Sequence, residues 1–480
     1  MLWRSLLFLA AIPALTSCAD DTPSAITVSV IGGPAKAGDP NRRKLDAPAQ
    51  VMTGALLQGL VQFDAKGEIE PALAERWLVT DDGLSYIFRI RRATWSDGSP
   101  VTAAQVAASL RASLSTANRN PIRPLFGQVR EILPMTESVV ELRLKEPQDE
   151  LLALLADPHM AISHRGRGTG PYRLHRAYPV AKILRPGVPP LAPEVGEETL
   201  KRNERRVRGE SSDMAVARFA MGNAALVLGG DFANAPLAQA AGTQERALRI
   251  DPVRGIFGLI PVRRTGPAGN AEVRQALAMA VDRADLIRRF GMPGWAAAET
   301  LMPGPIDTFI EAKPDWTALS LSERQARARA LIARQDQPVQ ITIDLPAGPG
   351  SRLLFARLAA DWQRIGVETQ RASPSRQADF ALIDQVAPTA NAAWYLLPFA
   401  CTDRGTCSAE ARNALSVARR ATREERARLF AEADQAIADA QLFIPLARPL
   451  RWSLVAPQLI GFSENMTGHH PLNRLGRSTN

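Results

Sequence analysis

The feature that most constrains the fold of this chain is the alternation of two hydrophobic periods along it. Segments 84–92, 138–147 and 338–346 place apolar and polar residues at alternate positions, as in "LSYIFRIRR". A period of two with one apolar side is typical of half-buried strands. Segment 224–230, "AALVLGG", is a short apolar run ended by glycines, which indicates a buried strand.

Between these strands, other segments repeat apolar residues every three or four positions, which predicts amphipathic helices. These segments are 99–114, 270–291, 351–366 and 422–441. Thr102, Asn270 and Thr422 are candidate N-caps, and Gly291 and Gly366 can end their helices. Because strands and helices alternate over most of the chain, we predict an α/β architecture.

Residues 185–212 interrupt this alternation. They follow neither period and are rich in Pro, Glu and Arg, so we interpret them as a long connection over the surface. The chain has 480 residues, which is too long for one compact core. We therefore expect two or three domains.

The N-terminus carries the pattern of a secretory signal. Arg4 precedes an apolar run from Leu6 to Leu15, which is too short to span a bilayer as a permanent helix. The ending "LTSC" resembles the bacterial lipobox, which implies cleavage before Cys18 and lipid attachment to its sulfur. The alternative is an ordinary signal peptide with an incidental cysteine.

Composition and motifs argue against several classes of function. The net charge is +9, but the basic residues are scattered, so we expect no nucleic-acid surface. The sequence lacks Gly-x-Ser-x-Gly, His-Glu-x-x-His, Walker A and Gly-x-Gly-x-x-Gly motifs, so we expect no enzymatic activity and no cofactor. No metal site is predicted, because the histidines lack the spacing of a recognised one. They are His159, His164, His175, His469 and His470.

Four blocks of the sequence resemble one known family. Residues 56–110 contain "GLVQFD", "IEPALAERW", "DDGLSYIFRIR" and "WSDGSPVTAAQV", and this order is similar to the first block of the family 5 extracellular solute-binding proteins. That family comprises the oligopeptide-, dipeptide- and nickel-binding receptors of ABC importers. Later blocks of the family resemble "GTGPYRL" at 168–174, "VRQALAMAVDRADLI" at 273–287 and "FIPLARPLRWSLVAPQLIGF" at 443–462.

The resemblance implies the α/β fold of a type II periplasmic binding protein, with two hinged lobes and an inserted domain. The implied limits are 1–18 for the signal peptide and lipidated cysteine, 24–50, 168–255 and 448–480 for lobe I, 51–167 for the inserted domain, and 256–447 for lobe II. A ligand between the lobes contacts both of them only in the closed form, so it favours closure. The implied partners are an ABC permease and its ATPase in the membrane, and we expect a monomer.

One functional motif of the family does not carry over. Its peptide-binding members hold the free amine of the peptide with an aspartate of a Trp-x-x-Asp-Tyr-like motif in the last lobe. Here Gln385 falls where the tryptophan is expected and Pro388 falls where the aspartate is expected. An enclosed ammonium without a carboxylate is costly, so either another acid serves or the ligand lacks a free amine.

Residues around this departure are the candidates for ligand contact. They are Asp384, Gln385, Trp394, Tyr395, Asp403 and Arg404. The two aspartates lie near the missing anchor and can substitute for it. The two aromatic residues can form stacking or wall contacts in a cleft, with core packing as the alternative.

Two of the three cysteines, Cys401 and Cys407, lie close together in the same region. If Cys18 is lipidated, they are an even pair in an oxidising compartment, which predicts a disulfide. A zinc clip would need two further ligands and a closer spacing. The predicted disulfide would fix the shape of a cleft loop that carries Asp403 and Arg404.

These observations lead to one hypothesis and two alternatives. The hypothesis is a periplasmic or otherwise extracytoplasmic lipoprotein that captures a peptide or similarly sized polar solute for an ABC importer. One alternative is a sensor or chaperone-like envelope lipoprotein on the same fold, which the missing aspartate favours. The other is a member that binds nickel or a metal chelate.

Overall fold

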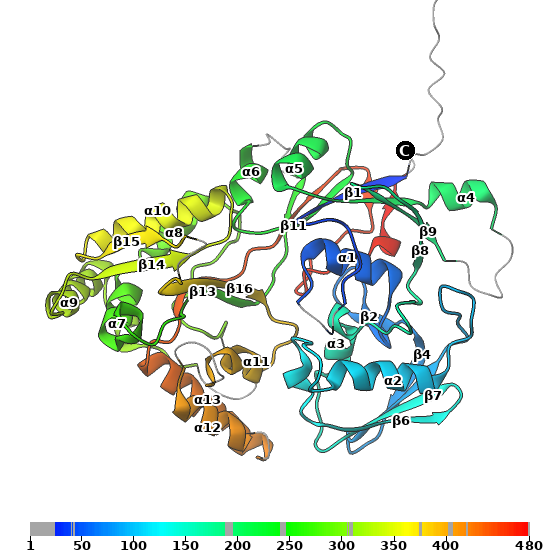
Figure 1. The fold of residues 1–480 in the computed structure, drawn as a ribbon, viewed down its shortest axis with the longest axis horizontal. Helices are drawn as coiled ribbons and strands as arrows, with labels where there is room; N and C mark the ends of the chain where they lie inside the picture. The colour runs from blue at the N-terminus through cyan, green and yellow to red at the C-terminus, as the bar shows by residue number, and fades with distance from the viewer. Residues whose placement is uncertain are drawn as a thin grey trace, which may run out of the picture.

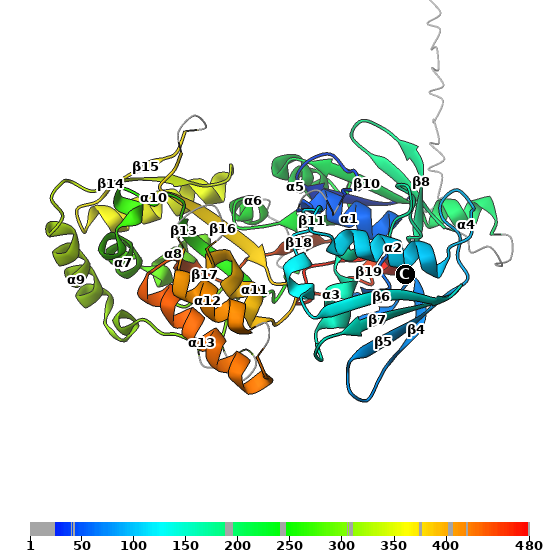
Figure 2. The same ribbon diagram turned by 60° about the horizontal axis from the view of Figure 1, so that its bottom comes forward.

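The computed structural model describes residues 25–39, 41, 44–187, 195–240, 246–304, 306, 311–373, 377–401, 407–418 and 421–478. Three main β-sheets with packed helices form two lobes and an inserted domain (Figure 1, Figure 2). The lipobox and Cys18 lie outside the described residues. No helix within the described ranges combines the length and the apolar character needed to span a bilayer.

Lobe I is built on a seven-stranded sheet with the strand order β12-β18-β11-β1-β10-β9-β8. Its central strand β1 (Ile26–Ile31) runs parallel to both neighbours. The other strands are β8 (Tyr172–Ala177), β9 (Lys182–Pro186), β10 (Arg205–Glu210), β11 (Leu226–Gly230), β12 (Leu248–Ile250) and β18 (Trp452–Val455). The helices of this lobe are α1 (Ala47–Leu56), α4 (Glu197–Arg202), α5 (Ser212–Ala220) and α6 (Ala235–Ala240). Strands β19 (Leu459–Ile460) and β20 (Gly476–Arg477) pair near the C-terminus.

The inserted domain is built on a four-stranded antiparallel sheet with the order β4-β5-β7-β6. The predicted alternation at 84–92 and 138–147 becomes β5 (Ser85–Ile90) and β7 (Val139–Leu144), and their apolar residues share a core with α2 (Ala103–Leu114). Thr102 caps α2 as predicted, in a capping box with Gln105. The remaining elements are β2 (Val61–Phe63), β3 (Ile69–Pro71), β4 (Ala74–Val79), β6 (Val129–Thr136) and α3 (Leu151–Ala156).

Lobe II contains a five-stranded sheet with the order β15-β14-β16-β13-β17. Its strands are β13 (Gly255–Pro261), β14 (Gln340–Asp344), β15 (Glu368–Arg371), β16 (Phe380–Val386) and β17 (Ile444–Ala447). Its helices are α7 (Ala271–Ala280), α8 (Arg283–Phe290), α9 (Leu321–Ala333), α10 (Pro349–Gln363), α11 (Ala392–Leu396), α12 (Ala409–Ala418) and α13 (Arg423–Asp439). The predicted helix at 270–291 is divided into α7 and α8, because Asp282 caps a new helix at Asp285 N.

The interpretation of 185–212 as a surface connection is wrong. This segment contains α4 and the strand β10, which pairs with β1 near the centre of the lobe I sheet. The strand tolerates a buried arginine because Arg205 donates to the carbonyl oxygens of Leu472 at 3.1 Å and Leu475 at 2.6 Å. Its guanidinium also lies over the Tyr172 ring, 5.7 Å from the centroid.

The chain crosses between the lobes at two short connections. One joins β12 of lobe I to β13 of lobe II, and the other joins β17 of lobe II to β18 of lobe I. A hydrogen bond of 3.0 Å from Asp251 N to Arg451 O holds the two crossings together. This paired crossing positions the hinge beside the space between the lobes.

Candidate functional site

A cavity of about 440 Å³ lies between the two lobes. Lobe I contributes Lys44, Asp231 and Arg451 to its wall, and lobe II contributes residues 385–388 and Trp394. Asp231 directly follows β11, and Arg451 directly precedes β18. The cavity therefore lies at the ends of lobe I strands and next to the hinge, where α/β proteins commonly bind ligands.

The predicted acid Asp384 is already paired with a base. It lies on β16, and both of its oxygens accept from Arg451 Nη1 at 3.0 Å. The pair joins the lobe II sheet to the hinge segment of lobe I. Because its charge is matched, Asp384 is not a free carboxylate for a ligand.

Two charged side chains of the cavity wall are not matched in this way. Asp231 Oδ1 accepts from Ala233 N at 2.9 Å and from Asn234 Nδ2 at 2.8 Å, the backbone of Asn234 also stabilises the carboxylate, and no described side chain donates a hydrogen bond to Oδ2. Burial, and next the charge of Asp384, raise the pKa of Asp231 to about 6. Lys44 forms no ion pair with any described residue, and desolvation followed by the Arg451 charge lowers its pKa.

The adjacent pair His469 and His470 meets the distant His159 at the same cavity wall, which their spacing did not indicate. His159 Nδ1 lies 2.7 Å from Asp157, and His470 Nε2 lies 3.0 Å from Asp251. His469 stacks on Phe63, with ring centroids 6.2 Å apart, and burial lowers its pKa. Within the described residues, no three His, Cys, Asp or Glu side chains are arranged to hold a metal ion.

The two aromatic candidates have different environments. Trp394 lines the cavity and packs against the cores of both lobe II and the inserted domain. Tyr395 is fully buried in the core of lobe II, where burial raises its pKa to about 12. Tyr395 therefore packs in the core, as the alternative interpretation expected. Gln385, like Trp394, lines the cavity.

Beyond Trp394, the inserted domain contacts lobe II directly. Glu146 pairs with Arg426 of α13, and Glu150 accepts a hydrogen bond from Asn391. These residues border a second space of about 540 Å³ between the inserted domain and the helices α11 to α13. We call the two contacts the rim contacts, and they hold the lobes together away from the cavity.

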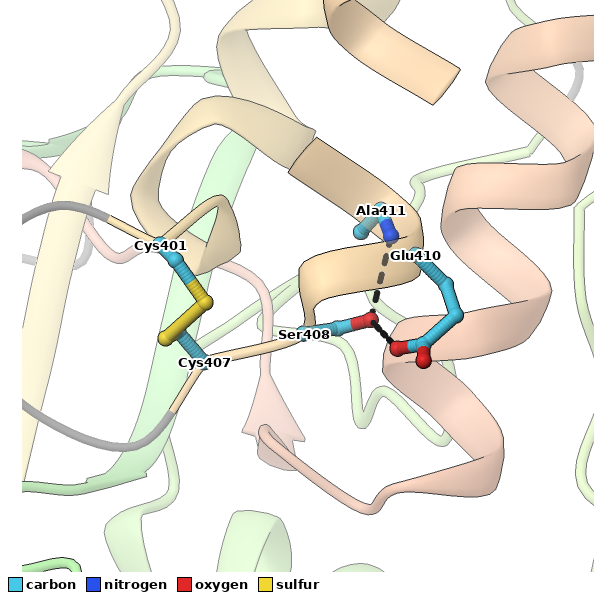
Figure 3. Close-up of a disulfide and its surroundings, with 5 residues drawn as sticks. All are labelled: Cys401, Cys407, Ser408, Glu410 and Ala411. Atoms are coloured by element: carbon cyan, nitrogen blue, oxygen red, sulfur yellow. Dashed lines mark hydrogen bonds between the residues drawn. A yellow bond between two sulfur atoms is a disulfide. The ribbon is translucent and has the colours of Figure 1, made fainter. Parts of the chain in front are cut away.

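A disulfide joins Cys401 and Cys407 immediately before α12 (Figure 3). Ser408 follows, accepts from Ala411 N at 3.0 Å and donates to Glu410 at 2.9 Å. The disulfide thus ties the end of the α11 segment to the start of α12. Asp403 and Arg404 lie outside the described residues.

Sequence reasoning missed Lys44, Asp231 and Arg451 as wall residues. A signal existed for Asp231, because it directly follows the apolar run predicted as a buried strand, and polar residues at such strand ends often contact ligands. No comparable signal marks Lys44, which reaches the cavity through the path of the chain before α1.

Two hinged lobes, an inserted domain and a cavity between the lobes are the architecture of a type II periplasmic binding protein. The model of the family described as "bacterial extracellular solute-binding proteins, family 5 middle" matches residues 68–397 of this chain. That range is more than half of the chain, so the protein belongs to this family.

Solved structures share this fold, and curated proteins are similar to the chain in sequence. Two solved structures each have a TM-score of 0.79 and 17% identity: the Haemophilus influenzae OppA complex with RPPGFSPFR, and the Escherichia coli murein tripeptide binding protein MppA. They cover 94% and 95% of this chain, and 99% of each of their own chains. The glutathione-binding protein GsiB of E. coli O1:K1 is 23% identical over 293 residues, which is 56% of this chain and 55% of the relative. The probable deoxycholate-binding periplasmic protein YgiS of E. coli K12 is 31% identical over 120 residues, which is 24% of this chain and 22% of that protein.

Proposed function

We propose that the protein is an extracytoplasmic substrate-binding lipoprotein of an ABC importer. It captures a peptide or similarly sized polar solute between its lobes and delivers it to a membrane permease. The observation that carries this proposal is the cavity of about 440 Å³ whose wall combines both lobes with the unmatched charges of Lys44 and Asp231. Its volume lies within the roughly 300–1,000 Å³ that is typical of small-molecule sites.

The identities of the relatives support a polar, peptide-like solute. OppA was solved with a peptide, MppA is described as binding a murein tripeptide, and GsiB is described as binding glutathione. The "LTSC" ending of the signal supports lipidation at Cys18. We further propose that the protein acts as a monomer, since the ligand cavity is built from one chain.

The proposal is tested with protein produced without residues 1–18. Native mass spectrometry would weigh any solute carried from the cell, and small-angle X-ray scattering would follow compaction on adding a peptide and solute library. We expect a bound solute and a smaller radius of gyration. A protein that carries no solute and does not compact with any library member would contradict the proposal and favour a chaperone-like role.

The meeting of three histidines favours one second candidate, a metal-chelate receptor. Two of the three are already paired with aspartates, which limits their freedom to bind a metal. Titration with nickel in the presence of free histidine distinguishes the two functions. Binding that His469→Ala and His470→Ala abolish, without any response to peptides, would establish the chelate receptor instead.

A further inference from the structure

We propose that Asp231 and Lys44 of lobe I hold the ammonium and the carboxylate of a compact zwitterionic solute. This inference rests on the proposed function, and it names the groups that recognise the solute. In the peptide-binding members of the family that this sequence resembles, an aspartate of the last lobe binds the free amine of the peptide. Here both charge contacts would belong to lobe I, on the opposite wall of the cavity.

The lobe II acid cannot serve as it stands, because Asp384 is held by Arg451 through both oxygens. Freeing it would leave the Arg451 guanidinium without its partner in a partly buried position, where Arg451 is 24% exposed. A ligand amine would have to displace Arg451 from Asp384 before its own contact with Asp384 could contribute to the binding free energy. An acid elsewhere on the wall is therefore the better partner for a cation.

Asp231 has the geometry of such a partner. Two hydrogen bonds to Oδ1 fix the orientation of the carboxylate, and they leave Oδ2 without a donor from any described side chain. Two other acids of the wall already have partners, since Asp157 pairs with His159 and Asp251 pairs with His470. A preoriented carboxylate with one open oxygen is suited to a charge-assisted hydrogen bond from an ammonium.

Asp46 is the one rival on the wall. Its Oδ1 accepts from Ala49 N at the start of α1, and the residue is exposed to solvent. An exposed carboxylate gains less from an added cation than a buried one, because water already screens its charge. Asp231 is more enclosed, and enclosure is what raises its pKa.

Lys44 supplies the opposite charge on the same wall. It forms no ion pair with a described residue, and its pKa is lowered first by desolvation and then by the positive charge of Arg451, which the negative charge of Asp384 opposes. A carboxylate brought by the solute would stabilise the charged form of Lys44 further. The described residues of the lobe II wall are Gln385, Val386, Ala387, Pro388 and Trp394. None of them has an ionisable side chain, so they are suited to the uncharged middle of the solute.

The test uses di- and tripeptides in four matched forms: free, N-acetylated, C-amidated and capped at both ends. Affinities are measured by isothermal titration calorimetry for the wild type and for Asp231→Asn, Lys44→Gln and Asp46→Asn. Asp213→Asn and Lys36→Gln remove the same charges from exposed positions outside the cavity and serve as matched controls. Melting temperatures confirm that each variant is folded.

We expect free peptides to bind at least about tenfold more tightly than either singly capped form. Asp231→Asn should weaken only the forms with a free amine, and Lys44→Gln only the forms with a free carboxylate. Capped peptides that bind as well as free ones would overturn this inference and leave the proposed function standing. An amine preference that Asp46→Asn removes and Asp231→Asn does not would also overturn it. If no form binds and the protein purified from cells carries no solute, both proposals fail.

Discussion

At the residue scale, charges far apart in the sequence meet at the cavity, and their pairing decides what each can do. Asp384 was a candidate from the sequence, but its environment depends on Arg451, which is 67 residues away. Sequence patterns indicate which residues lie on strands and helices, but they do not show which acid meets which base. The candidates on β16 and α11 could be proposed from the sequence for this reason. Asp231 carried a signal that was missed, at the end of a predicted buried strand, and Lys44 carried none.

The Asp384–Arg451 pair gives a first prediction. Arg451→Met should lower the free energy of unfolding by about 1–3 kcal/mol, because it leaves a partly buried carboxylate without its partner. Asp384→Asn combined with Arg451→Met should cost less than Arg451→Met alone. Urea denaturation of the two single variants and the double variant measures this coupling, and strictly additive effects would contradict it.

Asp434 on α13 gives a prediction about pH. Burial raises its pKa to about 6, although Ala312 N donates a 2.8 Å hydrogen bond to it. The raised pKa favours the protonated folded form, so its contribution to stability is complete below about pH 4 and is lost as the pH rises through 6. Asp434→Asn cannot ionise and should escape this loss.

The change from 3.8 to about 6 corresponds to at most about 3 kcal/mol in the free energy of unfolding. Relative to wild type, Asp434→Asn should gain about 1–3 kcal/mol between pH 4 and pH 7. Asp439→Asn, an exposed acid on the same helix, is the control and should show little change. If the free energy of unfolding varied with pH in the same way for Asp434→Asn and wild type, the Asp434 side chain would not be enclosed.

At the element scale, the hydrophobic periods predicted most strands and helices correctly, including β5, β7, β11, β14 and α10. They failed at β10, where Arg205 occupies a position that faces the interior. A periodicity argument treats arginine as a surface residue, but Arg205 is buried because backbone carbonyls of the C-terminal segment accept its hydrogen bonds. Such long-range contacts leave no local sequence signal.

Arg205→Met tests this account of β10. The change removes the Arg205 donor from Leu475 O and one of the donors from Leu472 O, which still accepts from the Tyr172 hydroxyl at 3.2 Å. We therefore expect a loss of about 2–4 kcal/mol in the free energy of unfolding. Arg206→Met on the same strand is exposed and should change it by less than about 0.5 kcal/mol. A similar small effect for both variants would contradict the structural role of Arg205.

The disulfide before α12 also belongs to this scale. Closing so short a loop should contribute roughly 2 kcal/mol through the entropy of the unfolded chain. Replacing Cys401 and Cys407 by serine should therefore lower the unfolding free energy by about that amount. A thiol assay on unreduced, folded protein should find no reactive group at these positions, and two free thiols would contradict the pairing.

At the scale of the whole molecule, the family resemblance predicted the two-lobed fold, which the solved relatives confirm. The domain limits of 51–167 and 256–447 stay predictions, which limited proteolysis can examine. The contacts between domains could not be predicted, because Glu146 and Arg426 come from segments that each fold within a different domain. Only the assembled molecule brings them together.

Glu146→Gln tests the rim contacts. Removing the charge weakens the pair with Arg426, so the ligand-free protein should become more open, with a larger radius of gyration in small-angle X-ray scattering. Solute affinity should fall about two- to tenfold, since more of the free protein must close before it binds. Glu198→Gln on α4 removes the same charge from an exposed position away from the lobe interface and should leave both quantities unchanged.

The position of the hinge has a mechanical consequence. Asp251 and Arg451 belong to the two crossings, so any force they exert on the other lobe acts close to the axis of rotation and produces little torque. The rim contacts join the α11 segment and α13 to the inserted domain, and Figure 1 shows α13 away from β11 and β13, so these contacts act through a longer lever arm. A modest ion pair at the rim can therefore resist opening more effectively than a stronger one at the pivot. Selection of the solute and retention of the solute would then depend on different residues, and each could change in evolution without the other.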